Sequence, residues 1–233
     1  MTGVFEHRRD AGRKLAKLLS AYADRTDVVV LGLARGGVPV AFEIAQALGA
    51  PLDVFISRKL GVPGQPELAM GAIASGGVCV FNERVIGELE LTPHGIEEVR
   101  VRELRELERR ELAYHGERLP LDVRGTQVIL ADDGLATGAT MQAALTALRR
   151  RHPAKIIVAV PVASRRACAM MRTMADECIC AVTPRLFMGV GQWYRDFTQT
   201  EDDEVGALLN QAAHDALESV GEHAFAGLGG THG

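Results

Sequence analysis

The sequence predicts an α/β protein with a central, mostly parallel sheet and helices on both faces. From residue 126 onward, strand-like and helix-like segments alternate strictly. The strand-like segments are apolar runs without polar residues at alternate positions, which is typical of parallel strands buried on both faces. Glycine turns follow the runs at 28–34 and 126–133 and open helix-like segments, as in repeated strand–turn–helix units.

Length and composition agree with one domain of this kind. The chain has 233 residues, a net charge of −4 and 47% hydrophobic residues, which exclude collagen-like, disordered and membrane-embedded classes. No stretch approaches the ~20 apolar residues of a spanning helix, and the charged first residues do not resemble a signal peptide. We therefore expect a cytoplasmic protein with no membrane partner and, from its balanced charge, no general nucleic-acid-binding surface.

The first part of the chain mixes helix and strand patterns with glycine-rich turns. Residues 58–71 contain three glycines and two prolines, which predict a long loop. Gly76-Gly77 lies between two apolar runs and predicts a hairpin turn. The other elements expected here are a packing helix at 6–22, a strand at 28–34, a helix ending at Gly49, a strand at 52–57 and ribbon strands at 72–75 and 78–81.

The second part begins with a long helix, 93–115, whose glutamates and arginines are interleaved at i,i+4 spacing. This pattern indicates a solvated helix face rather than an RNA-binding one. We expect a single domain, 1–222. Its parts are a core at about 28–183, a helical insertion at about 93–117 and a C-terminal hood at about 184–218, followed by a disordered tail at 223–233.

The four cysteines are Cys79, Cys168, Cys178 and Cys180. They include one C-x-C pair inside an apolar run and no C-x-x-C pair. A zinc site or redox motif therefore has little support, and we expect reduced, buried thiols.

The segment 128–140, VILADDGLATGAT, carries the strongest chemical signal. Asp132 and Asp133 follow an apolar strand, where paired carboxylates accept hydrogen bonds from vicinal hydroxyls or hold a hydrated divalent cation. The following small-residue turn opens a helix, whose N-terminal N–H groups attract phosphate. The segment therefore fits a phosphosugar.

This segment closely resembles the phosphoribosyl-pyrophosphate signature of the type I phosphoribosyltransferases. The resemblance covers about 28–183 and is closest to uncharacterised bacterial members. It implies a Rossmann-like fold with a flexible loop and a hood. It also implies that Asp132 and Asp133 contact the ribose hydroxyls together with Mg²⁺, and that the 5-phosphate is held by Ala136, Thr137, Gly138, Ala139 and Thr140. The alternative is an ordinary buried strand ending in an acidic turn.

In that family the loop after the first sheet strand holds pyrophosphate through backbone N–H groups and often a basic residue. The matching positions here are Ala34, Arg35, Gly36 and Gly37. The resemblance also implies a non-proline cis peptide bond, which we expect before Arg35. The alternative is a simple strand-to-helix turn.

Arg58 and Lys59 precede residues 60–70, whose position matches the mobile catalytic loop of these enzymes. The resemblance implies that Arg58 or Lys59, with Arg35, stabilises the departing pyrophosphate while the loop excludes water. Glu67 is an alternative contact for Mg²⁺ or for loop closure. The other interpretation is a plain surface loop.

The hood is the expected cover for the acceptor. Phe187, Trp193 and Tyr194 are candidates for stacking on a planar base, while anchoring of the C-terminal helix is an equal alternative. The hypoxanthine-guanine branch usually has an acid where this chain has Ala136. The identity of the acceptor therefore stays open.

Together these features predict a Mg²⁺-dependent phosphoribosyltransferase. It would use phosphoribosyl pyrophosphate and a nucleobase or related small-molecule acceptor, and we expect it to act as a homodimer. A phosphoribosyl-pyrophosphate-binding or nucleotide-binding regulator is the alternative, which a contiguous basic face on the long helix would favour.

Overall fold

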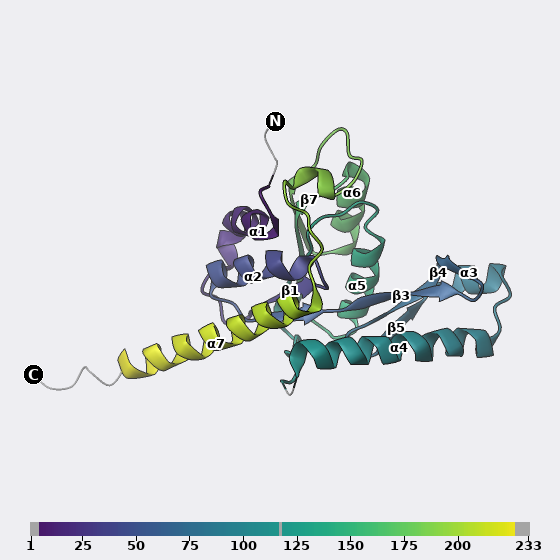
Figure 1. Cartoon of the computed structure of the whole chain (residues 1–233), viewed down its shortest axis with the longest axis horizontal. Helices are drawn as coiled ribbons and strands as arrows, with labels where there is room; N and C mark the ends of the chain where they lie inside the picture. Colours follow the sequence, from purple (N-terminus) through teal and green to yellow (C-terminus); the bar gives the residue numbers. More distant parts are fainter. Residues whose placement is uncertain (1–4, 117, 227–233) are drawn as a thin grey trace, which may run out of the picture.

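The computed structural model describes residues 5–116 and 118–226 (Figure 1). Its centre is a five-stranded parallel sheet with the strand order β2-β1-β6-β7-β8. This confirms the predicted α/β fold class. The strands are β1 (Val28–Leu33), β2 (Leu52–Phe55), β6 (Gln127–Ala131), β7 (Lys155–Val162) and β8 (Glu177–Val182).

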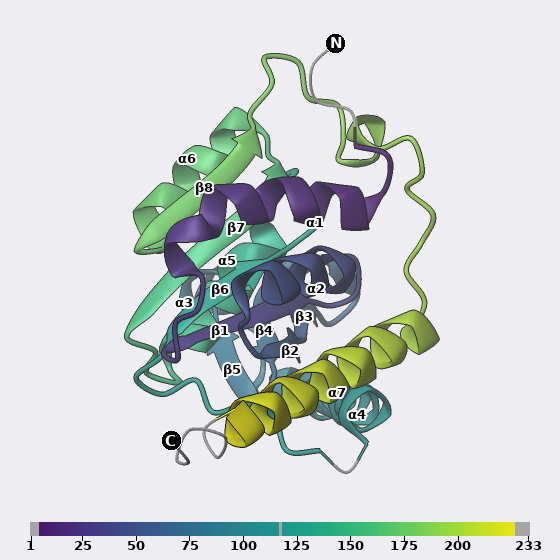
Figure 2. The ribbon, with the colours of Figure 1, turned by 90° about the vertical axis from the view of Figure 1, so that its left-hand side faces the viewer.

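Helices cover both faces of this sheet, because its central strands are apolar on both sides. In Figure 2, α1 (Arg8–Ala16) and α2 (Gly37–Leu48) lie on the near face. On the far face, α5 (Ala139–Arg149) and α6 (Arg165–Met174) pack on the alternate side chains of the same strands. The helix expected at 6–22 is α1 continued by a 3-10 helix, Lys17–Tyr22.

A second, antiparallel sheet has the strand order β3-β4-β5. It consists of β3 (Ser57–Val62), β4 (Gln65–Ala74) and β5 (Val78–Phe81). The Gly76-Gly77 turn is confirmed, with φ of 81° and 71°. The long loop expected at 58–71 is wrong: Gly64, at φ 78°, makes a tight turn between two paired strands. Leu60, Val62 and Met70 are buried, so apolar packing stabilises this hairpin despite its glycines and prolines.

We call the antiparallel sheet β3–β5 the ribbon. The ribbon and the long helix α4 (Pro93–His115) run side by side, with the short helix α3 (Glu83–Glu88) at their far end (Figure 1). Thr92 caps α4, and Val99, Leu107 and Tyr114 are its buried apolar side chains. The predicted long helix is confirmed. We call the ribbon, α3 and α4 together the arm.

After β8 the chain passes through a 3-10 helix, Gly191–Trp193, to α7 (Asp202–Ala226). Helix α7 packs against α2, β2 and α4. The tail expected at 223–233 begins inside α7, and 227–233 lies outside the described residues. Within residues 5–116 and 118–226, no helix is both long and apolar enough to span a membrane.

Candidate active site

The ends of β1 and β6 bring the two glycine-containing turns together. These strands are parallel neighbours in which Gly32 aligns with Ala131, so the residues after both strands lie at one sheet edge. The approach is close: a Cβ on Gly36 would lie 2.1 Å from Asp133 Oδ2, and one on Gly37 would lie 2.5 Å from Ala131 O. The peptide bond between Ala34 and Arg35 is cis, as expected.

Asp132 and Asp133 lie beside this turn as a partly buried acid pair. Asp132 Oδ1 accepts a hydrogen bond from the Asp133 N–H at 2.8 Å. Burial raises the pKa of both carboxyls, and the neighbouring charge of Asp133 raises the pKa of Asp132 further. A cation or a set of hydroxyl donors at this edge would favour the ionised pair.

Arg8 is a functional candidate that the sequence did not reveal. Its Nε donates to Asp133 Oδ2 at 2.8 Å, and the two side chains are only 11% and 15% exposed. Its Nη1 donates to the Thr198 carbonyl at 2.6 Å, and its guanidinium carbon lies 4.0 Å from the centre of the Phe197 ring. Arg8 therefore opposes the rise in the Asp133 pKa and fixes the orientation of that carboxylate.

Two helices begin at this edge without a side-chain cap. Gly36 precedes α2, and Gly138 (φ 80°) precedes α5. The other α-helices whose caps are described, α1, α3, α4 and α6, each have a side-chain acceptor, from His7, Asn82, Thr92 and Ser164 respectively. Glycine has no side chain to accept from the first-turn N–H groups, and among the described residues the one side-chain acceptor at these two ends is Thr137 Oγ1, 3.4 Å from the Ala139 nitrogen. Both helix ends therefore suit an anion.

The side chain of Arg35 lies beside the first residues of α7. Its Nη1 is 3.1 Å from Glu201 Oε2 and 3.8 Å from Asp202 Oδ1, and the side chain is 26% exposed. The backbone of the loop 34–37 therefore lies against the acid pair. The Arg35 side chain of this loop is paired with the carboxylates of Glu201 and Asp202.

Arg58 and Lys59 are separated because adjacent strand residues point to opposite faces. Arg58 pairs with Glu103 of α4 at 2.6 Å. Lys59 lines a cavity of about 520 Å³ between the ribbon and α5, together with Asn82 and Thr140, and its Nζ lies 3.2 Å from Glu67 Oε2. Lys59 thus shares a cavity with Thr140 of the predicted phosphate turn, while Arg58 is paired with α4 and lines a second cavity of about 390 Å³ together with Lys59.

The three predicted stacking aromatics belong to one cluster, around Phe5 and Tyr194. Tyr194 is only 6% exposed, its ring lies 5.5 Å from Phe5 and 5.0 Å from Phe197, and its hydroxyl donates to the Asp133 carbonyl at 2.6 Å. Tyr194 thus has no free face for a base and instead supports the end of β6. Phe187 and Trp193 are partly buried at the margin of the cluster.

Residues 5–190 match the family model described as the phosphoribosyl transferase domain. The chain belongs to this family. It is 47% identical over 216 residues to a Mycobacterium tuberculosis protein named "Putative phosphoribosyl transferase Rv0571c", a match that includes 93% of this chain and 48% of that protein. The chain therefore spans about half the length of this curated relative.

The chain is also similar to a solved structure. The crystal structure of TT1426 from Thermus thermophilus has a TM-score of 0.79 and 39% identity to this chain, and the match covers 88% of this chain and 97% of that one. A shorter match, 48% identical over 52 residues, links 22% of the chain to 28% of a Listeria monocytogenes "Bifunctional protein PyrR". The phosphoribosyltransferase fold is thereby established for this chain.

Proposed function

We propose that this protein transfers the 5-phosphoribosyl group of phosphoribosyl pyrophosphate to a nucleobase or a related acceptor and releases pyrophosphate. One observation carries the proposal: the two helices without a side-chain cap, α2 and α5, begin on either side of the acid pair Asp132–Asp133. The donor has phosphate groups at both ends of a ribose, which matches two anion sites flanking two hydroxyl acceptors.

In this arrangement the backbone of 136–140 binds the 5-phosphate at the start of α5, and Thr137 and Thr140 add hydroxyl donors. The carboxylates of Asp132 and Asp133 accept hydrogen bonds from the ribose hydroxyls. The backbone of 34–37 binds the pyrophosphate at the start of α2. Arg35 adds a positive charge there once it leaves Glu201.

The donor set at this edge fits Mg²⁺. Carboxylate oxygens are hard ligands, and Mg²⁺ is usually held by one or two carboxylates together with substrate phosphates and water. Within the described residues, no third His, Cys, Asp or Glu ligand atom joins Asp132 and Asp133 in a ready-made metal cage, so the substrate supplies the remaining ligands. Bound there, Mg²⁺ supplies positive charge to the leaving pyrophosphate.

Lys59 is the residue of the ribbon that we assign to the reaction. It lines the cavity that also contains Thr140, and among the described residues its ammonium group contacts the exposed Glu67 side chain and the Glu67 carbonyl alone. Closure of the ribbon over the donor site brings this charge to the pyrophosphate and excludes water from the ribosyl centre. The acceptor lies on the side of Phe187 and Trp193.

The regulatory alternative is less well supported. It needs a contiguous basic face on α4, but the arginines there alternate with acids, as in the pairs Arg100–Glu97 and Arg109–Glu106. Cytoplasmic location and homodimer formation stay predictions, and sedimentation of the purified chain tests the second.

Isothermal titration calorimetry with phosphoribosyl pyrophosphate, with and without Mg²⁺, tests the proposal. We expect Mg²⁺-dependent binding that the double variant Asp132→Asn, Asp133→Asn abolishes, together with pyrophosphate release. Asp122→Asn, which changes an exposed acid outside the site, is the control. Equal binding by the double variant, or no binding at millimolar ligand, contradicts the proposal.

A further inference from the structure

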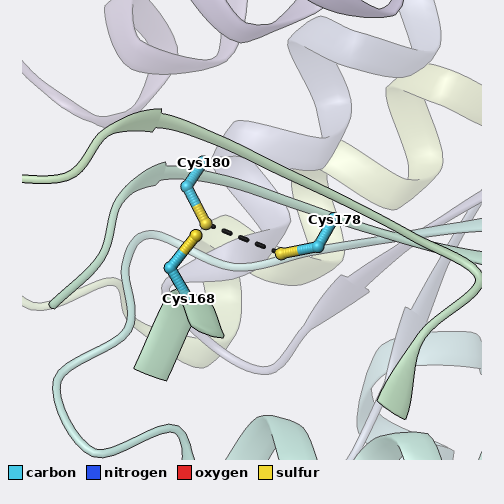
Figure 3. Close-up of side chains that lie close together, drawn as sticks. All are labelled: Cys168, Cys178 and Cys180. Atoms are coloured by element: carbon cyan, nitrogen blue, oxygen red, sulfur yellow. Dashed lines mark hydrogen bonds between the residues drawn. The ribbon is translucent and has the colours of Figure 1, made fainter. Parts of the chain in front are cut away.

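Three of the four cysteines meet on the side of the sheet covered by α6 (Figure 3). Cys168 comes from α6, and Cys178 and Cys180 come from the edge strand β8. All three Sγ atoms lie within 4.8 Å of one another, and those of Cys178 and Cys180 are 3.6 Å apart. All three cysteines are free thiols.

The fold explains this convergence. Residues two apart in a strand share a face, so Cys178 and Cys180 both point toward α6, while Ile179 between them packs on the opposite side of the sheet. Cys168 is 2% exposed and lies in the same core cluster as Met171. The sequence showed the C-x-C pair but not its third member, which lies ten residues earlier on another element.

The sulfur positions match those of a thiolate metal site. With Zn–S bonds of about 2.3 Å, tetrahedral geometry places two sulfur ligands about 3.8 Å apart. The Sγ atoms of Cys178 and Cys180 are 3.6 Å apart, and Cys168 Sγ lies within 4.8 Å of both. We propose that Cys168, Cys178 and Cys180 bind one thiophilic divalent cation of the Zn²⁺ class, with a water molecule as the fourth ligand. Each thiol that coordinates the cation releases its proton to solvent.

Ligand type and charge both favour this class of cation. Thiolates are soft ligands that select Zn²⁺ or Cu⁺ over Mg²⁺. Three thiolates and a divalent cation have a net charge of −1, which the positive charge of nearby Arg172 offsets. With a monovalent cation, the same three thiolates would have a net charge of −2. Cys178 and Cys180 are partly exposed, so water reaches the fourth position.

The site also has a structural role. A bound cation cross-links α6 to the edge strand β8. Helix α6 lies directly behind the phosphate turn, because a Cβ on Gly138 would lie 2.9 Å from Met170 Cε and 3.5 Å from Ala167 Cβ. The cation therefore stabilises the support of that turn without contacting the substrate, and its binding is independent of the proposed transferase activity.

The test uses the full-length, reduced protein and Cd²⁺ as the probe, because Cd²⁺–thiolate bonds absorb in the ultraviolet. We expect one Cd²⁺ per chain, displaced by excess Zn²⁺. Cys178→Ala and Cys180→Ala should each weaken binding roughly 100-fold or more, since a ligand is lost. Cys79→Ala, which changes the cysteine outside the cluster, should bind as the wild type does.

Thiol alkylation of the wild-type protein provides a measurement that needs no variant. Zn²⁺ should protect three of the four cysteines, and mass spectrometry should identify Cys79 as the one still modified. Wild-type binding no tighter than that of the Cys178→Ala variant overturns the proposal, as does equal alkylation of all four cysteines with and without Zn²⁺.

Discussion

The Asp133 carboxylate contacts Arg8 of the first helix. The backbone carbonyl of Asp133 accepts a hydrogen bond from the hydroxyl of Tyr194, in the segment between β8 and α7. Parts of the chain more than 180 residues apart thus meet at one residue. The sequence motif named this aspartate but not its neighbours, because a side-chain pairing over 125 residues leaves no local pattern. Nothing in the sequence distinguishes Arg8 from Arg9, which pairs with Glu43 instead.

We predict that Arg8→Met weakens phosphoribosyl pyrophosphate binding about 10-fold, because Asp133 loses a charge-assisted hydrogen bond that orients it. Arg8→Lys should be intermediate, since an ammonium group cannot reproduce the guanidinium contacts to both Asp133 and Thr198. Arg13→Met, which removes an exposed arginine of the same helix, is the control. Calorimetry measures the binding, and unchanged affinity in Arg8→Met refutes the positioning role.

Gly36 provides a second prediction at this scale. Its backbone has φ −60° and ψ −26°, which alanine adopts freely. The only obstacle to alanine is space, because the added Cβ would lie 2.1 Å from Asp133 Oδ2. Gly36→Ala should therefore abolish substrate binding.

Gly87→Ala is the matched control for that variant, since nothing lies within 4 Å of its Cβ position. Thermal unfolding should show both variants folded. Substrate binding by Gly36→Ala at the wild-type affinity would mean that the turn moves away from Asp133 without consequence.

At the scale of elements, two hydrogen bonds between Ile56 and Ser75 connect the region between the two sheets. Ile56 is the single residue between β2 and β3, and it is 1% exposed. Its N–H donates to Ser75 Oγ, and its carbonyl accepts from the Ser75 N–H, both at 2.9 Å. This pairing fixes the base of the arm.

Ser75→Ala should destabilise the protein by about 1–3 kcal/mol, because it leaves the buried Ile56 N–H without an acceptor. Urea denaturation measures the change, with the exposed Ser20→Ala as the control. A shift no larger than that of the control would mean that another acceptor replaces the hydroxyl.

The end of α4 carries a pH-dependent contact. His115 and Asp53 are buried together with Nε2 and Oδ1 2.7 Å apart, and His115 Nδ1 faces the Glu111 carbonyl at 3.1 Å. Both ring nitrogens therefore face acceptors, which suits the imidazolium form. The hydrogen bond to Asp53 raises the pKa of His115 above its usual value of 6.5.

Because folded His115 keeps its proton to a higher pH than unfolded His115 does, this contact stabilises the protein fully below pH 6.5. That stabilisation is lost as the pH rises through the raised pKa. Urea denaturation across this range should show stability falling with pH, and a flatter slope for Asp53→Asn. The exposed His94→Gln should keep the wild-type slope.

Long, strongly patterned elements were predictable from sequence, as 93–115 and the five parallel strands show. The hairpin β3–β4 was not, because its glycines and prolines dominate the local pattern while burial of Leu60 and Met70 against distant residues decides its structure. The same error placed Arg58 and Lys59 on a loop. The opposite orientations that their side chains have on strand β3 were therefore not predicted.

For the molecule as a whole, the sequence pointed to the proposed substrate site through residues close together in the chain, at 34–37 and 132–140. What it missed depends on how the elements pack: Arg8 beside Asp133, the burial of Tyr194, and the third cysteine beside β8. Tertiary packing alone brings these residues together, so local spacing carried no signal for them.

The arm is joined along its length and attached to the main sheet at one end. Figure 1 shows the ribbon and α4 extending together from the main sheet. Arg58–Glu103 ties these two parts together, and Ile56–Ser75 and His115–Asp53 hold them near the sheet. A small rotation about the Ile56–Ser75 and His115–Asp53 contacts would move α3 and the hairpin tip, which lie at the far end of the arm, over a much larger distance. In the proposed closure over the substrate, we therefore expect the ribbon and α4 to move together as one body about the contacts at their base.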